Sequence, residues 1–322
     1  MKKVVNFLVA GLIVLGLAPQ SVQAAQLLIP VGKVVGLELR SDTVTVAAFD
    51  DSLGTGARDA GLRIGDEILT IDGRTIDSAE DVRGALADCD EDVDVLVSRD
   101  GKKHRLTLTP KDTEDGPRLG VYLRQGIAGI GTVTYYDPET HEFGTLGHGV
   151  SDAKGNLVQM TMGNLYTGQV LSVKKGSSGH PGQLRGSAAP EEAIGTIEKN
   201  TAQGVFGTSK AGWLGEPLPV ASYSQVTTGP AAIRSTVIGD TVQEYSVEIL
   251  KIYPQDREDS RNFLIKVTDP ALLEATGGIV QGMSGSPIIQ NGRLVGAVTH
   301  VLVNDPSTGY GIFIENMLDA AA

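Results

Sequence analysis

The sequence feature that most limits the fold of this chain is a glycine-rich turn, Gly-Met-Ser-Gly-Ser-Pro, at residues 282–287. Glycines on both sides of Ser284 let the backbone turn sharply, so that the hydroxyl projects and nearby backbone N–H groups converge on one point. Residues 288–298 follow as two apolar runs joined by Asn-Gly, which is typical of a strand, a hairpin turn and a second strand. The turn therefore predicts a nucleophilic Ser284 at the entrance of a β-hairpin, with Gly282 and Ser284 N–H as oxyanion donors.

A second copy of this turn pattern, Gly-Ser-Ser-Gly-His-Pro, occupies residues 176–181. Residues 182–187 follow it and are polar and rich in glycine, so no strand is expected behind this copy. We therefore interpret Ser178 as a surface-loop serine and keep Ser284 as the predicted nucleophile.

A serine hydroxyl needs a base, usually histidine, before it becomes an effective nucleophile. Three of the five histidines lie in other contexts: His104 in a strand pattern of the N-terminal module, His141 in a charged turn and His180 in the second glycine-rich turn. His148 lies between two glycines, which let the backbone approach a neighbour. It also precedes Ser284 in the chain, as the base precedes the nucleophile in trypsin-like folds. These observations predict His148 as the general base.

Residues 277–288 and 296–306, taken with 126–132 and the segment around His148, resemble the sporulation stage IV B serine peptidases of endospore-forming bacteria. The resemblance extends from about the start of the mature chain to Leu318. It implies a mainly β fold, in which a PDZ domain is followed by a trypsin-like double β-barrel. It also implies a catalytic triad formed by His148, Asp269 and Ser284.

This resemblance implies an extracytoplasmic serine endopeptidase that acts during sporulation, in the space between the forespore and mother-cell membranes. The implied substrate is a membrane-bound regulator of an intramembrane metalloprotease, whose release activates the late mother-cell sigma factor. Cleavage of the enzyme's own N-terminal segment is implied as well. The alternative is a PDZ peptide-binding adaptor with a catalytically inactive barrel. The joint presence of His148 and the complete turn at 282–287 favours the enzyme.

The sequence around Asp269 also has a purely structural interpretation. Asp269 precedes Pro270 and a short apolar run that ends at Gly277, which is the pattern of an N-cap, a first helical residue and a helix stop. This structural role explains Asp269 without catalysis. Three other aspartates therefore remain alternatives for the acid: Asp137, Asp152 and Asp240.

The N-terminus has the pattern of a secretory signal. Two lysines precede an apolar run at residues 4–18, and small residues follow before residue 25. We expect residues 1–25 to be a signal peptide or an N-terminal membrane anchor, with membrane contact through residues 4–18. Residues 24–31 are expected to form an exposed stretch suited to self-cleavage.

Charge and composition exclude several functions. The net charge is −12, and removal of residues 1–24, which hold two lysines and no acidic residue, makes it −14. Such a chain is a poor partner for nucleic acid. The single Cys89 excludes an internal disulfide framework, and no Cys/His set has metal-ligand spacing, so no cofactor or metal is expected.

Two domains are expected after the signal. Residues 28–111 are expected to form the PDZ domain, because residues 60–73 resemble the bacterial PDZ signature and a helix begins at Ser78. Residues 118–322 form short apolar runs broken by turns, which suits two six-stranded barrels with the site between them. Four residues are expected to bind peptide, on a strand and on the helix of the PDZ domain: Val35, Gly36, Leu37 and Val82.

His300 lies on the strand that follows the nucleophile hairpin. In trypsin-like folds this region forms one wall of the primary specificity pocket, so His300 is a candidate for shaping substrate recognition. A half-buried strand histidine bonded to the backbone is the alternative interpretation.

Overall fold

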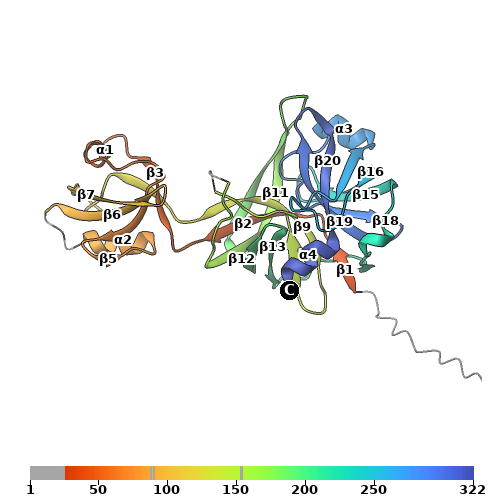
Figure 1. Cartoon of the computed structure of the whole chain (residues 1–322), viewed down its shortest axis with the longest axis horizontal. Coiled ribbons are helices and arrows are strands. Elements are labelled where there is room, and N and C mark those ends of the chain that lie inside the picture. The colour runs from red at the N-terminus through yellow and green to blue at the C-terminus, as the bar shows by residue number, and fades with distance from the viewer. Residues whose placement is uncertain (1–25, 88, 90, 153–154) are drawn as a thin grey trace, which may run out of the picture.

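The structure, a computed structural model, describes residues 26–322 except residues 88, 90 and 153–154. The predicted signal peptide or anchor at residues 1–25 lies outside the described residues. Figure 1 shows a small domain at one end of the molecule and two β-barrels packed together at the other. In the part that is described, no helix is both long and apolar enough to cross a membrane. The predicted mainly β fold, with a PDZ domain and a double barrel, is confirmed.

The first barrel is a closed ring of six antiparallel strands. The β9–β10 pairing closes a sheet that otherwise runs from β10 through β13, β12, β11 and β2 to β9. Apolar side chains that alternate along β2 face its core, as expected for a strand with one buried face. The six strands are β2 (Val34–Arg40), β9 (Ile127–Tyr136), β10 (Glu142–Thr145), β11 (Met162–Lys174), β12 (Gln183–Thr201) and β13 (Gly204–Ser209).

The second barrel closes in the order β15-β16-β17-β20-β19-β18. Its core contains Phe263 and Phe313, whose rings meet edge to face at 4.5 Å between centroids. The predicted hairpin after Ser284 is confirmed, with Asn291 and Gly292 at positive φ in its turn. Its strands are β15 (Gly229–Thr236), β16 (Val242–Ile252), β17 (Phe263–Val267), β18 (Pro287–Gln290), β19 (Arg293–Leu302) and β20 (Asp305–Phe313).

Smaller elements complete the barrels. Helix α3 (Pro270–Thr276) follows β17, and the C-terminal helix α4 (Ile314–Ala321) packs against β13 and β19. The 3-10 turn η1 (Tyr223–Gln225) precedes β15. Strand β14 (Leu218–Pro219) lies between the two barrels in the sequence and pairs with β1 (Leu27–Pro30).

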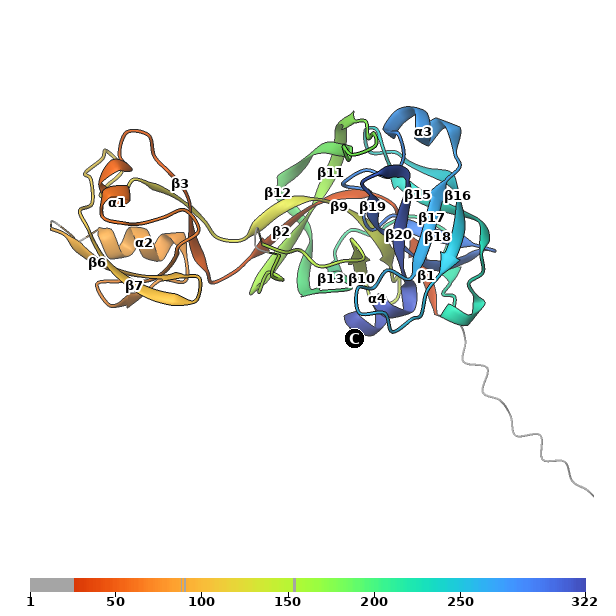
Figure 2. The same ribbon diagram turned by 45° about the horizontal axis from the view of Figure 1, so that its top comes forward.

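The PDZ domain is inserted into the first barrel, between β2 and β9 (Figures 1 and 2). Its sheet has the order β7-β6-β4-β3-β8, with β5 added to β4. Its strands and helices are β3 (Val44–Phe49), α1 (Thr55–Asp59), β4 (Glu67–Ile71), β5 (Arg74–Thr75), α2 (Ala79–Leu86), β6 (Val93–Arg99), β7 (Lys102–Leu108) and β8 (Val121–Arg124). The helix predicted from Ser78 is confirmed, because the Ser78 side chain caps α2 by accepting a hydrogen bond from Asp81 N–H.

This insertion changes the domain boundaries expected from the sequence. Residues 28–40 do not belong to the PDZ sheet, because β2 is hydrogen-bonded to β9 on one side and to β11 on the other. The PDZ sheet instead extends past residue 111 to β8, which pairs with β3. An apolar strand such as β2 suits either sheet, and only its partners decide where it belongs.

The segment that begins at Gln26 also differs from the expected exposed stretch. Strand β1 pairs with β9 and β14, and Leu28 and Ile29 are buried. The Gln26 carbonyl accepts a hydrogen bond from Val220 N–H. Residues 26–31 are thus held against the first barrel by hydrogen bonds. Residues 27–31 are therefore a poor site for cleavage.

We predict that Leu28→Ala lowers the free energy of unfolding by about 2–5 kcal/mol, because it leaves a cavity under β1. Leu27→Ala is the matched control: Leu27 is 52% exposed, so the change should stay within about 0.5 kcal/mol. Urea unfolding of the two variants measures the difference. Equal effects at the two positions would show that β1 does not pack as described.

Candidate active site

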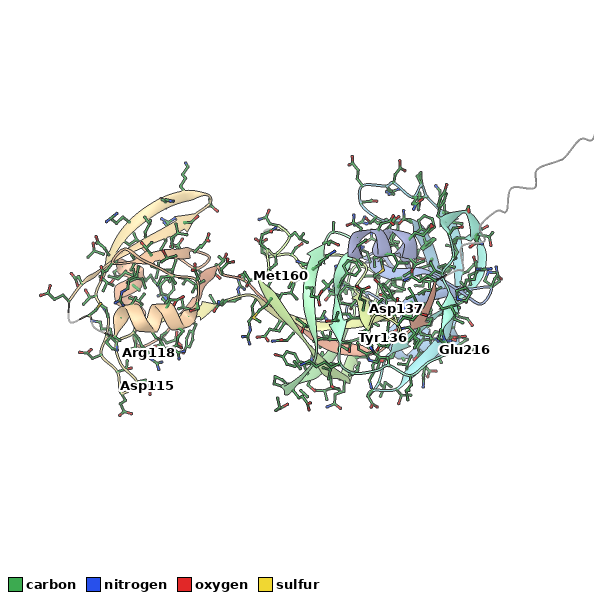
Figure 3. All side chains as sticks on the ribbon, turned by 90° about the horizontal axis from the view of Figure 1, so that it is seen from below. Asp115, Arg118, Tyr136, Asp137, Met160 and Glu216 are labelled. Atoms are coloured by element: carbon green, nitrogen blue, oxygen red, sulfur yellow. The ribbon has the colours of Figure 1, made fainter. Side chains whose placement is uncertain are left out.

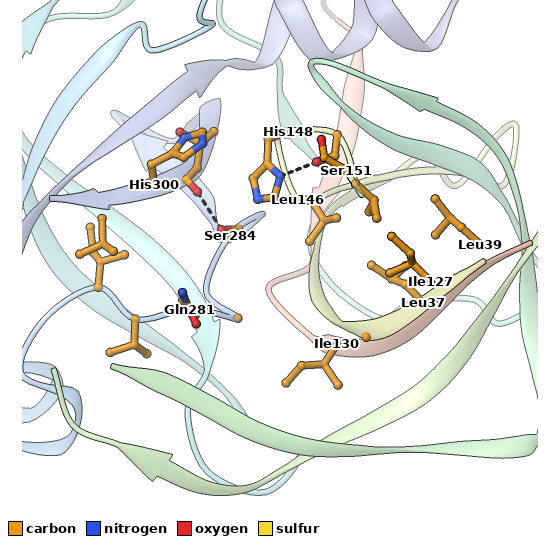
Figure 4. Close-up of a pocket in the computed structure, with 18 residues that line it drawn as sticks. Leu37, Leu39, Ile127, Ile130, Leu146, His148, Ser151, Gln281, Ser284 and His300 are labelled. Carbon is orange, nitrogen blue, oxygen red and sulfur yellow. Dashed lines mark hydrogen bonds between the residues drawn. The ribbon is translucent and has the colours of Figure 1, made fainter. Parts of the chain in front are cut away.

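The two predicted catalytic side chains line one cleft between the barrels, as Figure 4 shows. Ser284 lies in the turn before β18, and His148 lies in the loop after β10. The cavity has a volume of about 480 Å³ and is lined mostly by apolar side chains from both barrels. The closed barrels therefore bring together two segments that are far apart in the sequence.

The turn around Ser284 needs its glycines. Gly282 and Gly285 have φ of +98° and +95°, a region that side-chain-bearing residues rarely adopt. A Cβ on Gly285 would lie 2.0 Å from the Thr132 carbonyl oxygen, so the backbone could not pack there with any other residue. The Met283 carbonyl accepts a hydrogen bond from Ser286 N–H at 2.9 Å and closes the turn.

The predicted oxyanion donors are available. Among the described residues, no protein acceptor takes a hydrogen bond from the backbone N–H of Gly282 or Ser284. Their carbonyls are bonded instead to the buried Thr132: its hydroxyl donates to Gly282 at 2.8 Å and its N–H donates to Ser284 at 3.3 Å. Two unpaired N–H groups beside a serine hydroxyl are the donors that a tetrahedral oxyanion requires.

His148 is held in the form that a general base needs. Its Nδ1 lies 2.9 Å from the carbonyl oxygen of Gly149. A carbonyl only accepts, so Nδ1 carries the proton and Nε2 keeps its lone pair. Burial lowers the pKa of His148, and the Gly149 carbonyl opposes this shift to a smaller extent. His148 is therefore neutral at neutral pH.

The Ser284 hydroxyl is not bonded to His148 here. Its Oγ donates to the Thr299 carbonyl at 2.8 Å, and no hydrogen bond links Ser284 to His148 in the described part of the chain. Rotation about the Cα–Cβ bond of Ser284 has to bring the hydroxyl to Nε2. Loose contacts of this kind are common in peptidases without substrate.

The structure does not bring Asp269 to His148, and the expected triad is corrected on this point. Asp269 is the N-cap of α3: one carboxylate oxygen accepts from Ala271 and Leu272 N–H at 3.0 Å, and the other accepts from Ser246 N–H at 3.3 Å. Asp269 does not line the cleft, and no aspartate contributes to the pKa shift of His148.

The three alternative aspartates do not line the cleft either. Asp137, which Figure 3 labels beside Tyr136, accepts from the N–H groups of a local turn. Asp152 accepts from Asn156, and Asp240 is exposed. In this structure His148 is oriented by a backbone carbonyl rather than by a carboxylate.

His300 lies in the same cleft, with its ring centroid 5.3 Å from that of His148. Its Nδ1 is buried and has no hydrogen-bond partner among the described residues, so the expected bond to backbone is not formed at that atom. Burial lowers the pKa of His300 to about 4, and His148 and Arg261 add to the effect. The neutral ring forms part of the cleft wall, and its role in specificity stays a prediction.

A second groove lies in the PDZ domain, between α2 and residues 116–123. Val82 lines it, as predicted from the sequence. Strand β8 forms the open edge of the sheet beside α2, and the N–H groups of Leu119 and Gly120 donate to no acceptor within the described residues. Asp115 and Arg118, labelled in Figure 3, both line the groove and form an ion pair.

The other predicted peptide-binding residues are corrected. Val35, Gly36 and Leu37 lie on β2 in the first barrel, where strands on both sides leave no free edge. Leu37 instead lines the cleft that contains Ser284. The run Leu-Gly-Val at residues 119–121 is a signal that the sequence analysis missed. In this run a glycine precedes an apolar strand at the end of the domain.

This fold and this cleft define a serine endopeptidase of the trypsin-like fold that carries a PDZ domain. The family model described as SpoIVB peptidase S55 matches residues 115–318, which is more than half of the chain. The chain belongs to the SpoIVB peptidase S55 family. A PDZ domain model matches residues 34–109, although strand pairing assigns residues 34–40 to the first barrel.

Other proteins are similar over shorter or more divergent stretches. "Putative zinc metalloprotease R01501" of Rhizobium meliloti (strain 1021) is 26% identical over 221 residues, 65% of this chain and 56% of that protein. The mitochondrial serine protease HTRA2 of Drosophila grimshawi is 38% identical over 60 residues, 19% of this chain and 14% of that protein. The active form of the Rv3671c protease from M. tuberculosis matches with a TM-score of 0.36 and 15% identity, over 62% of this chain and 75% of that one.

We predict that Asp269→Asn leaves turnover within about twofold, because asparagine caps a helix as well as aspartate does. Asp269→Ala should lower the free energy of unfolding by about 1 kcal/mol and leave the turnover of the folded protein unchanged. Peptidase kinetics and urea unfolding of both variants check this. A steep loss of turnover in a stable Asp269→Asn protein would restore Asp269 as the triad acid.

We also predict the acid limit of activity. The base must be neutral, and the lowered pKa of His148 keeps it neutral to a more acidic pH than an ordinary histidine. The acid limb of kcat/KM should therefore have a midpoint below 6.5, the usual histidine value. A pH profile with a peptide substrate measures it, and a midpoint above 6.5 would contradict this description of His148.

Proposed function

We propose that this protein is an exported serine endopeptidase of sporulation, which acts in the space between the forespore and mother-cell membranes. Its substrate is a membrane-bound regulator of an intramembrane metalloprotease, and cleavage leads to activation of the late mother-cell sigma factor. The observation that supports this most is the cleft that holds Ser284, His148 and two free N–H donors, in a chain of the SpoIVB peptidase S55 family.

The cleft supports acyl transfer through a Ser284–His148 pair. Ser284 Oγ leaves the Thr299 carbonyl, gives its proton to His148 Nε2 and attacks the scissile carbonyl carbon. The oxygen that becomes negative is held by the N–H groups of Gly282 and Ser284. His148 then gives the proton to the leaving amine. In the second half, His148 takes a proton from a water molecule that attacks the acyl carbon, the bond to Ser284 Oγ breaks, and His148 returns the proton to Ser284 Oγ. The Gly149 carbonyl keeps Nδ1–H in place throughout.

The walls of the cleft support a preference for apolar substrate residues next to the scissile bond. Leu37 and Ile130 come from the first barrel, and Val280 and Val301 from the second. An apolar substrate side chain that packs against these residues would be removed from water, which is favourable. His300, neutral and beside His148, would shape recognition at the same place.

The PDZ groove supports capture of a protein chain end. Strand β8 has a free edge to which a peptide adds as a further strand, and the free N–H groups of Leu119 and Gly120 suit a terminal carboxylate. Val82 of α2 would contact the last side chain of that peptide. The partner is a membrane-associated protein.

Self-processing also belongs to the proposed function, at a site that lies nearer the N-terminus than residues 27–31. Residues 4–18 contact the membrane, and the enzyme cleaves its own N-terminal segment. The burial of β1 argues against cleavage at 27–31. We therefore propose that cleavage falls before Gln26.

An active-site phosphonate tests the proposal. We expect labelling and proteolysis in the wild-type protein and in Ser178→Ala, whose side chain is an exposed donor to the Asn304 carbonyl. Ser284→Ala should lose label and roughly 10⁴–10⁶-fold in turnover, His148→Ala a similar factor, and the double variant little more. In a spore former, Ser284→Ala should also abolish activity of a late mother-cell sigma-factor reporter. If the wild-type protein takes no label, the peptidase function is rejected and the PDZ adaptor remains as the alternative. Normal reporter activity in the Ser284→Ala strain would reject the sporulation role.

A further inference from the structure

The two oxyanion donors are fixed by different parts of the molecule. Each backbone N–H shares a planar trans peptide with the carbonyl of the preceding residue, and the two groups point in opposite directions. The N–H of Ser284 belongs to the same peptide group as the Met283 carbonyl, which accepts a hydrogen bond from Ser286 N–H within the turn. The N–H of Gly282 belongs to the same peptide group as the Gln281 carbonyl.

The Gln281 carbonyl is held from the first barrel. It accepts a hydrogen bond from Leu184 N–H at 2.8 Å, at the start of β12. The Gln281 N–H donates to the Gly182 carbonyl at 3.0 Å, so that two bonds link residue 281 to residues 182–184 in a parallel bridge. Thr132, which orients the next carbonyls of the turn, makes no bond to Gln281.

Packing keeps this contact in place. The Leu184 side chain is buried, and a Cβ on Gly282 would lie 3.0 Å from the Leu184 Cβ. A Cβ on Gly182 would lie 2.6 Å from Val280, so the two segments touch along their backbones. The β11–β12 hairpin, which Figure 2 shows extending from the first barrel toward the second, therefore ends directly against the approach to the nucleophile turn.

We propose that Leu184 is a positioning residue for catalysis: its backbone N–H holds the Gln281 carbonyl and thereby points Gly282 N–H into the oxyanion hole. If that bond is broken, the peptide between residues 281 and 282 rotates and turns the Gly282 N–H away from the cleft. Ser284 and His148 stay in place, but one of two donors is lost. This inference rests on the proposed peptidase function.

The test removes one N–H and keeps the side chain. Incorporation of the α-hydroxy analogue of leucine at position 184 replaces the Leu184 amide by an ester. We expect kcat to fall about 10²–10³-fold, the range seen when one oxyanion donor is lost, with KM nearly unchanged. Affinity for a peptide boronate, whose adduct places an oxygen in the hole, should fall by a similar factor. Affinity for the cleaved product peptide should not change.

The matched control is the same ester at Leu171. Leu171 lies on the same hairpin, at the register shift between Val170 and Ser172, and its side chain is 65% exposed. This ester should leave kcat within about twofold. Leu184→Ala keeps the N–H but loses side-chain packing, so it should lower thermal stability, and kcat of its folded fraction should fall less than kcat of the 184 ester.

The outcomes separate the two proposals. Equal kcat for the esters at 184 and 171, with an active wild-type protein, would reject the role of Leu184 and leave the peptidase function standing. A fall in activity of the 184 ester that only follows its loss of folded protein, measured by active-site titration and thermal unfolding, would also reject it. A wild-type protein that takes no phosphonate label would reject the peptidase function, and the inference with it.

Discussion

Thr132 makes the contacts on which the active site depends. This buried residue of β9 bonds to both carbonyls of the nucleophile turn, at Gly282 and Ser284. Its own carbonyl accepts from the Thr145 hydroxyl at 2.5 Å and from Leu146 N–H at 3.3 Å, at the start of the loop that carries His148. One residue of the first barrel thus links the base loop to a turn of the second, and the relative position of the catalytic groups follows from it.

The parts of this site that the sequence predicts are those set by local backbone chemistry. The turn around Ser284 needs glycine at particular positions, and the hairpin after it needs Asn-Gly, so both are visible in the sequence. The cap of α2 by Ser78 is local as well. His148 is found because its flanking glycines and its order relative to Ser284 leave few competitors.

The parts that the sequence does not predict depend on partners distant in the chain. Strand β2 alternates apolar side chains in a way that suits a PDZ sheet or a barrel, and only pairing with β9 and β11 decides. Thr132 has no local signal, since its role comes from a turn in the other barrel. For Asp269 the local capping pattern predicts the contacts that the structure shows. The catalytic role implied by the resemblance does not predict them.

The insertion of the PDZ domain affects how the first barrel forms. Strands β2 and β9 are neighbours in the barrel, yet a whole domain separates them in the chain. A loop of that length without structure would cost entropy each time its ends met. In the folded PDZ domain, Thr45 and Arg124 are paired, so the two chain ends leave the domain side by side. When the PDZ domain is folded, β2 and β9 start from adjacent chain ends, which lowers the entropy cost of pairing them in the barrel.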